Sequence, residues 1–150
     1  MSYSPMIGIE TETGESILSC DFSSGGYPSL EGKLFDMISD LVRQGLASYS
    51  EDTKDRYPAT VIVHKATDAV KKIMLPVVEE IVARGLHLRN ARYHYELTAK
   101  RIANNADLKP EYEEWKMKVE NGERYNVACL EALRSFPSDE GFIITAWGTL

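Results

Sequence analysis

Four stretches of the sequence have the hydrophobic pattern of β-strands. Residues 7–13 and 16–22 alternate apolar and polar side chains around Gly14-Glu15, which predicts a β-hairpin. Residues 59–64 are β-branched and nearly all apolar, which predicts an interior strand covered on both faces. A similar run at 142–147 predicts a last strand.

Three other stretches have apolar residues at helical spacing. Ser29 is a good N-cap for a helix that continues to about Leu46. A second helix is expected from Thr67 or Asp68 to Gly85, kinked or divided at Pro76. A third begins at Pro110, ends before Pro137 and could split at Asn121-Gly122. The polar residues 48–56 predict an exposed loop.

The segment 86–97 fits either a strand or a helix. As a strand it would place Asn90, Arg92, His94 and Glu96 on one face. As a helix it would pair Arg92 with Glu96, and Glu96 with Lys100, at four-residue spacing. We favour the strand because Gly85 ends the preceding helix and aromatic residues are frequent in the segment. Residues 59–97 would then form a strand–helix–strand unit.

Together these elements predict a single α/β (or α+β) domain over residues 1–150. Its sheet is expected to be mixed, with about five strands, an N-terminal β-hairpin and three to four helices. Ribonuclease-H-like and deaminase-like folds have roughly this element order, but the residues themselves indicate no family.

The composition is that of an ordinary soluble protein, with 43% hydrophobic and 27% charged residues. No apolar run approaches the roughly 18 residues that a membrane span needs, and the first residues lack the pattern of a signal peptide. We therefore expect a cytoplasmic protein. Cys20 and Cys129 are expected to be buried thiols, and without a C-x-x-C pair no metal or cofactor is predicted.

The charge is unevenly distributed. The net charge of −6 argues against strong binding to duplex nucleic acid. Residues 84–101 nevertheless carry five cations and one acid, so the −6 divides into +4 for this segment and −10 for the rest. Arginine can grip phosphate through two hydrogen bonds, and tyrosine and histidine rings can stack on a base. The predicted ligand-binding residues are Arg89, Arg92, Tyr93, His94, Tyr95, Lys100 and Arg101. Alternatively, these cations pair with the acids of 111–123 or with a neighbouring subunit.

Two enzymatic interpretations have weaker support. His94-Tyr95-Glu96 matches the H-x-E half of a deaminase signature, but the P-C-x-x-C half is missing. A metal-dependent nuclease or phosphodiesterase would need converging carboxylates. Its weak candidates also fit a solvated hairpin face, a helix cap or a strand end: they are Glu10, Asp21, His64 and Asp68.

The sequence thus favours a small cytoplasmic protein that binds an anionic, nucleotide-like ligand without catalysis. The partner would be an anionic small molecule or a short single-stranded nucleic acid. A homo-oligomer is expected, because exposed sheet edges often close against a second copy. The alternatives are the nuclease and a protein-interaction module, an inhibitor or assembly factor, that acts through the acidic surface. The residues leave open whether the protein is an enzyme.

Overall fold

The computed structural model describes residues 4–23, 29–51 and 59–148. They form one α+β domain with an antiparallel sheet and four α-helices. In chain order the elements are β1 (Met6–Thr11), β2 (Ser16–Asp21), α1 (Leu30–Arg43), β3 (Ala47–Tyr49), β4 (Ala59–Val63), α2 (Asp68–Ala83), α3 (Leu86–Ile102), the short 3₁₀-helix η2 (Ala106–Leu108), α4 (Lys109–Arg134) and β5 (Phe142–Trp147).

The sheet has five strands in the order β2-β1-β5-β4-β3, and every neighbouring pair is antiparallel. The predicted N-terminal hairpin is confirmed as β1 and β2. The prediction of a mixed sheet is wrong. β5, the last strand in the sequence, lies in the centre and pairs with both β1 and β4.

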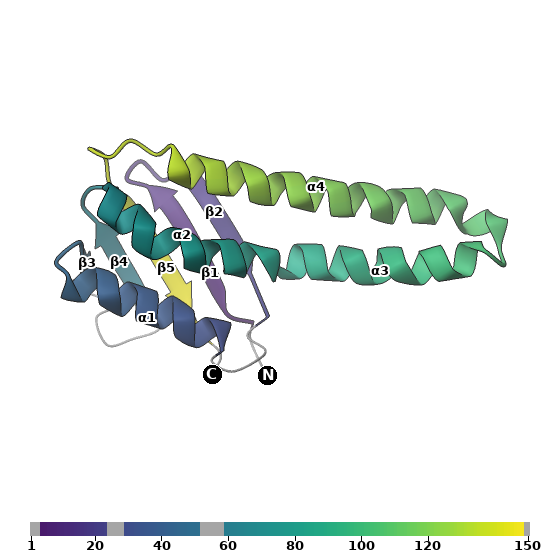
Figure 1. The fold of residues 1–150 in the computed structure, drawn as a ribbon, viewed down its shortest axis with the longest axis horizontal. Helices are drawn as coiled ribbons and strands as arrows, with labels where there is room; N and C mark the ends of the chain where they lie inside the picture. The colour runs from purple at the N-terminus through teal and green to yellow at the C-terminus, as the bar shows by residue number, and fades with distance from the viewer. Residues whose placement is uncertain (1–3, 24–28, 52–58, 149–150) are drawn as a thin grey trace.

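One face of the sheet is covered by helices and holds the core. Figure 1 shows α1 and α2 lying across this face, with the C-terminal part of α4 beside them. Alternate strand residues point into the core, such as Ile7, Val61 and Ile144, and all three are fully buried. The helices contribute residues such as Leu34 and Met74, also fully buried. The core therefore lies between one sheet face and one helix layer.

The opposite face of the sheet is not covered by any described helix (Figure 1). Its side chains include Ile62 on β4, 36% exposed, and Trp147 on β5, 43% exposed. The prediction that residues 59–64 form a strand covered on both faces is therefore wrong in that one respect. The strand is interior in the sheet, but helices cover only one side of it.

α3 and α4 form a helical arm that extends away from the sheet. Figure 1 shows α3 continuing from the end of α2, while α4 runs back antiparallel beside it. The strand favoured for residues 86–97 is therefore wrong, because this segment lies inside the 17-residue helix α3. The sequence periodicity of Leu88, Ala91 and Thr98, which are buried in α3, is helical. Packing against α4 prevails over the strand propensity of the aromatic residues.

The other helices follow the predicted signals with two differences. The Ser29 and Thr67 hydroxyls accept hydrogen bonds from the Gly32 and Val70 amides, so both cap predictions are confirmed. α2 passes through Pro76 as one helix, so the alternative of a division there is wrong, and α4 passes through Asn121-Gly122 without a break. In the region predicted as a loop, β3 occupies 47–49, while residues 52–58 lie outside the described part.

Both cysteines are buried free thiols, as predicted. Burial raises the pKa of the Cys20 thiol to about 12, and burial also raises the pKa of Cys129. No helix within the described residues is long and apolar enough to cross a bilayer.

Candidate functional site

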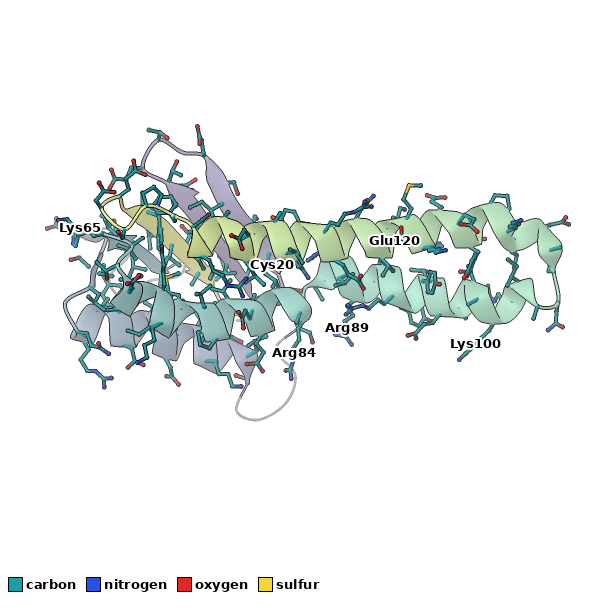
Figure 2. The ribbon with its side chains drawn as sticks, turned by 45° about the horizontal axis from the view of Figure 1, so that its top comes forward. Cys20, Lys65, Arg84, Arg89, Lys100 and Glu120 are labelled. Carbon is teal, nitrogen blue, oxygen red and sulfur yellow. The ribbon has the colours of Figure 1, made fainter. Side chains whose placement is uncertain are left out.

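An open groove lies at the junction between α2 and α3. It has a volume of about 510 Å³. Its lining comes from three places in the sequence: the residues just after β2, the end of α2 and one side of α3. The lining residues are Ser23, Ala83, Arg84, Arg89, Arg92, Tyr93 and Glu96. In Figure 2 the labelled Arg84, Arg89 and Lys100 lie along the same edge of α2 and α3. Three of the seven lining residues are therefore arginines.

Backbone contacts fix the junction beneath the groove. The Ser23 amide donates to the Arg84 carbonyl at 3.3 Å, and Phe22 forms an isolated antiparallel bridge with Gly85. A side chain on Gly85 would collide with the His87 ring, because a Cβ there would lie 2.5 Å from His87 Cε1. Glycine therefore lets only two residues separate the end of α2 from the start of α3.

α4 closes the junction from the other side. The Asn126 side-chain amide donates to the Val82 carbonyl at 2.9 Å, which satisfies a carbonyl in the last turn of α2. The Asn126 carbonyl oxygen lies 3.1 Å from His87 Nε2, which donates to it in the matching tautomer. The groove is thus supported by β2, α2, α3 and α4 together.

Each arginine in the groove contacts a neighbouring side chain. Arg89 Nη1 donates to the Ser23 hydroxyl at 2.9 Å. Arg92 lies 3.5 Å from a Glu123 oxygen, and Arg84 lies 3.8 Å from a Glu80 oxygen. A guanidinium has five N–H donors, so the single contacts of Arg89 and Arg92 with described residues orient these side chains while leaving donors available.

Tyr93 and Glu96 complete the groove without hydrogen-bond partners in the described structure. Tyr93 is 62% exposed, and its ring meets His94 only edge-on. Glu96 forms no hydrogen bond or ion pair with any described residue, although Arg92 and Lys100 are each four residues away on α3. The groove therefore presents an exposed ring next to a free carboxylate.

His94 and Tyr95, both predicted to bind ligand, lie in the seam between α3 and α4. The His94 ring stacks on Trp115 at 4.4 Å between centroids. The Tyr95 and Tyr112 hydroxyls are 3.0 Å apart, and this hydrogen bond is the main reason why the pKa of Tyr95 is raised. These rings hold the arm together instead of lining the groove.

Lys100 and Arg101 lie further along α3, outside the groove lining. Both side chains are exposed, and neither forms a hydrogen bond or ion pair with the described residues. Of the seven predicted ligand-binding residues, the structure brings three together in the groove: Arg89, Arg92 and Tyr93. The alternative pairing with acids of 111–123 is seen for Arg92 with Glu123.

The weak catalytic candidates do not converge. Asp21 pairs with Met6 and Glu10 with Ser16, so the two acids lie at opposite ends of the first hairpin. Asp68 is in the first turn of α2. His64 Nε2 lies 3.1 Å from the hydroxyl of Ser48 on β3, which is the edge strand opposite to β2. Among the described residues, no group of three or more His, Cys, Asp or Glu side chains could hold a metal ion.

Four lining residues were not among the predicted site residues: Ser23, Ala83, Arg84 and Glu96. Arg84 and Glu96 belong to the segment whose charge is unusual, so the charge count pointed to them. Ser23 is more than sixty positions away in the sequence, and only the bridge between Phe22 and Gly85 brings it to the groove.

No protein-family model matches this sequence, no curated protein is significantly similar to it, and no solved structure matches its fold.

Proposed function

We propose that this protein binds an anionic, nucleotide-like ligand in the groove at the α2–α3 junction. The observation that supports it best is the convergence of Arg84, Arg89 and Arg92 with the exposed ring of Tyr93 in one groove. Three guanidinium groups suit phosphate, and an exposed ring beside them suits a planar base. Both parts of a nucleotide therefore have a complement in the same place.

Arg89 and Arg92 are the residues assigned to phosphate. They are three residues apart on α3, so their Cβ atoms are neighbours at about 5–6 Å. Ser23 restrains the Arg89 guanidinium, and Glu123 restrains that of Arg92. Such restraint lowers the conformational entropy lost when a ligand binds. Arg84, held by Glu80, adds a third positive charge at the end of α2.

Tyr93 is the residue assigned to the base. Its ring is 62% exposed and directly follows Arg92 in the sequence. Stacking of a base on an aromatic ring contributes about 1–3 kcal/mol and depends little on which base is stacked. Lys100 and Arg101, further along α3, would add a long-range positive field that attracts the ligand.

The test is a titration of the full chain with nucleoside diphosphates at low salt, in which binding is measured by calorimetry or by fluorescence. Arg92→Ala is expected to weaken binding about tenfold or more, because one charge-assisted contact is lost. Arg43→Ala is the matched control, since Arg43 is an exposed arginine on α1 that pairs with Asp40 alone among the described residues. Its affinity should equal that of the unmodified chain.

Stability is measured on the same variants by urea unfolding. An exposed ion pair such as that of Arg92 contributes little, about 0.2–1 kcal/mol. Loss of affinity without a comparable loss of stability supports the groove as the binding site. The proposal is overturned if no nucleoside diphosphate binds at millimolar concentration, or if Arg92→Ala binds as well as the control.

A further inference from the structure

Glu96 is an acid in an otherwise cationic groove. Among the described lining residues it is the only carboxylate, beside three arginines. A carboxylate repels phosphate, so at this position it disfavours a ligand that is anionic throughout. A ligand that fits the whole groove must therefore present hydrogen-bond donors to Glu96.

The carboxylate of Glu96 is also available to a ligand. Arg92 is one turn before it on α3, yet the Arg92 guanidinium lies 3.5 Å from Glu123 on α4. Lys100 is one turn after Glu96 and forms no ion pair within the described residues. Both oxygens of Glu96 consequently remain free to accept hydrogen bonds.

Tyr93 and Glu96 are three residues apart on the same helix face. Their Cβ atoms are therefore neighbours, about 5–6 Å apart, and both side chains line the groove. A base stacked on Tyr93 would place its edge within reach of the Glu96 carboxylate. An ionised carboxylate accepts hydrogen bonds through both oxygens and donates none.

We infer that Glu96 makes this groove selective for guanine nucleotides; this rests on the function proposed above. Guanine alone among the common bases presents two adjacent donors on its Watson–Crick edge, the ring N1–H and the exocyclic amino group. The two oxygens of one carboxylate can accept both hydrogens at once. Arg89 and Arg92 would hold the phosphates while Glu96 holds the base.

The other bases fit Glu96 poorly for a chemical reason. Adenine and cytosine each present an amino group beside a ring nitrogen that is an acceptor. Uracil presents one N–H between two carbonyl oxygens. In each case a lone pair on the base faces a carboxylate oxygen, and this repulsion rejects the ligand. One good two-bond contact to a base gives about 1–3 kcal/mol of discrimination, or roughly 5- to 150-fold in affinity.

The experiment compares GDP, ADP, CDP and UDP on the full chain by titration calorimetry, together with inosine diphosphate, which lacks the exocyclic amino group. GDP is expected to bind at least tenfold more tightly than ADP, CDP or UDP, with inosine diphosphate in between. Glu96→Gln is expected to weaken GDP binding about tenfold. It should strengthen ADP binding, because an amide can donate to adenine N1 and accept from its amino group.

Glu120→Gln, an exposed acid on α4 outside the groove (Figure 2), is the matched control and should leave all affinities unchanged. Equal binding of all four diphosphates would overturn guanine selectivity while leaving the proposed nucleotide site in place. An equal loss of affinity for all four diphosphates in Glu96→Gln would also overturn guanine selectivity, since Glu96 would then contact the ribose that the four ligands share. Absence of binding by every diphosphate would overturn both the proposed function and this inference.

Discussion

The Tyr125 hydroxyl on α4 bonds to both backbone groups of Ser19 on the outer edge of β2. It donates to the Ser19 carbonyl and accepts from the Ser19 amide, with both distances at 3.3 Å. β2 is an edge strand, and unpaired backbone groups on an edge invite pairing with another chain. This side chain therefore occupies part of the edge where a second copy would add a strand.

Tyr125→Phe is expected to lower the free energy of unfolding by about 1 kcal/mol, because both Ser19 bonds are lost. It should also increase self-association, because the β2 edge becomes free. Urea unfolding and sedimentation velocity measure the two effects. Tyr93→Phe is the control, since the Tyr93 hydroxyl has no partner among the described residues. The homo-oligomer expected from the sequence stays a prediction, and the same sedimentation run on the unmodified chain tests it.

Asn126→Ala is expected to destabilise the protein by about 1–3 kcal/mol. The substitution leaves the Val82 carbonyl and the His87 ring without the partner that Asn126 supplies. Urea unfolding with circular dichroism measures the change. Asn90→Ala is the control, because Asn90 is exposed on α3. A variant as stable as the control would show that Asn126 does not hold the junction together.

Alkaline pH is expected to destabilise the fold through Cys20. Burial raises the pKa of this thiol from 9.0 to about 12. The folded state thus holds the proton more tightly than the unfolded state, so the contribution to stability is complete below pH 9. It is lost as the pH rises toward 12, by up to about 1.4 kcal/mol per pH unit.

Urea midpoints between pH 7 and 11 measure this loss, with Cys20→Val as the reference in which only the other groups titrate. The unmodified chain should lose stability more steeply above pH 9 than Cys20→Val. Parallel curves for the two proteins would mean that Cys20 is not protected from ionisation by the fold.

The outer part of the helical arm is expected to exchange its amide hydrogens faster than the sheet. Only three residues of α3 and two of α4 are buried, and both of those in α4, Cys129 and Leu133, lie near its C-terminal end. Stacked pairs, including His94 with Trp115, hold the outer part. Few buried contacts mean a low free energy of local opening.

Hydrogen exchange by mass spectrometry should thus show residues 95–118 exchanging before β5. Trp115→Ala should further increase the rate of amide exchange in the arm and leave the rate in β5 nearly unchanged. Leu133→Ala is the comparison, because Leu133 belongs to the main core and its loss should accelerate both regions. Exchange at one uniform rate would mean that arm and sheet open together.

The sequence identified most elements because their signals are local. The hairpin turn, the two helix caps and the final strand all depend on residues within a few positions of one another. α3 was assigned wrongly because its helix depends on a distant partner. Gly122 on α4 lets Leu88 approach, and a Cβ there would lie 3.0 Å from Leu88 Cδ1. The break predicted at Gly122 and the strand predicted after Gly85 are both wrong for the same reason, namely the packing of α3 against α4.

The candidate groove was predictable in part. The charge excess of residues 84–101 pointed to Arg89 and Arg92, and no tertiary information was needed for that step. The charge count could not separate Tyr93, which lines the groove, from His94 and Tyr95, which face α4. That separation follows from the helical rotation of about 100° per residue. A strand would instead place Tyr93 and Tyr95 on one face and His94 on the other.

The position of β5 has a consequence for how the molecule assembles. β1 with β2 and β3 with β4 are each local hairpins, but no ladder joins one hairpin to the other until β5 enters between them. The two halves of the sheet are thus joined by a strand that follows the whole helical arm in the sequence. Such non-local pairing slows folding. During synthesis both hairpins would emerge from the ribosome before β5, so their inner edges would stay unpaired until β5 is released.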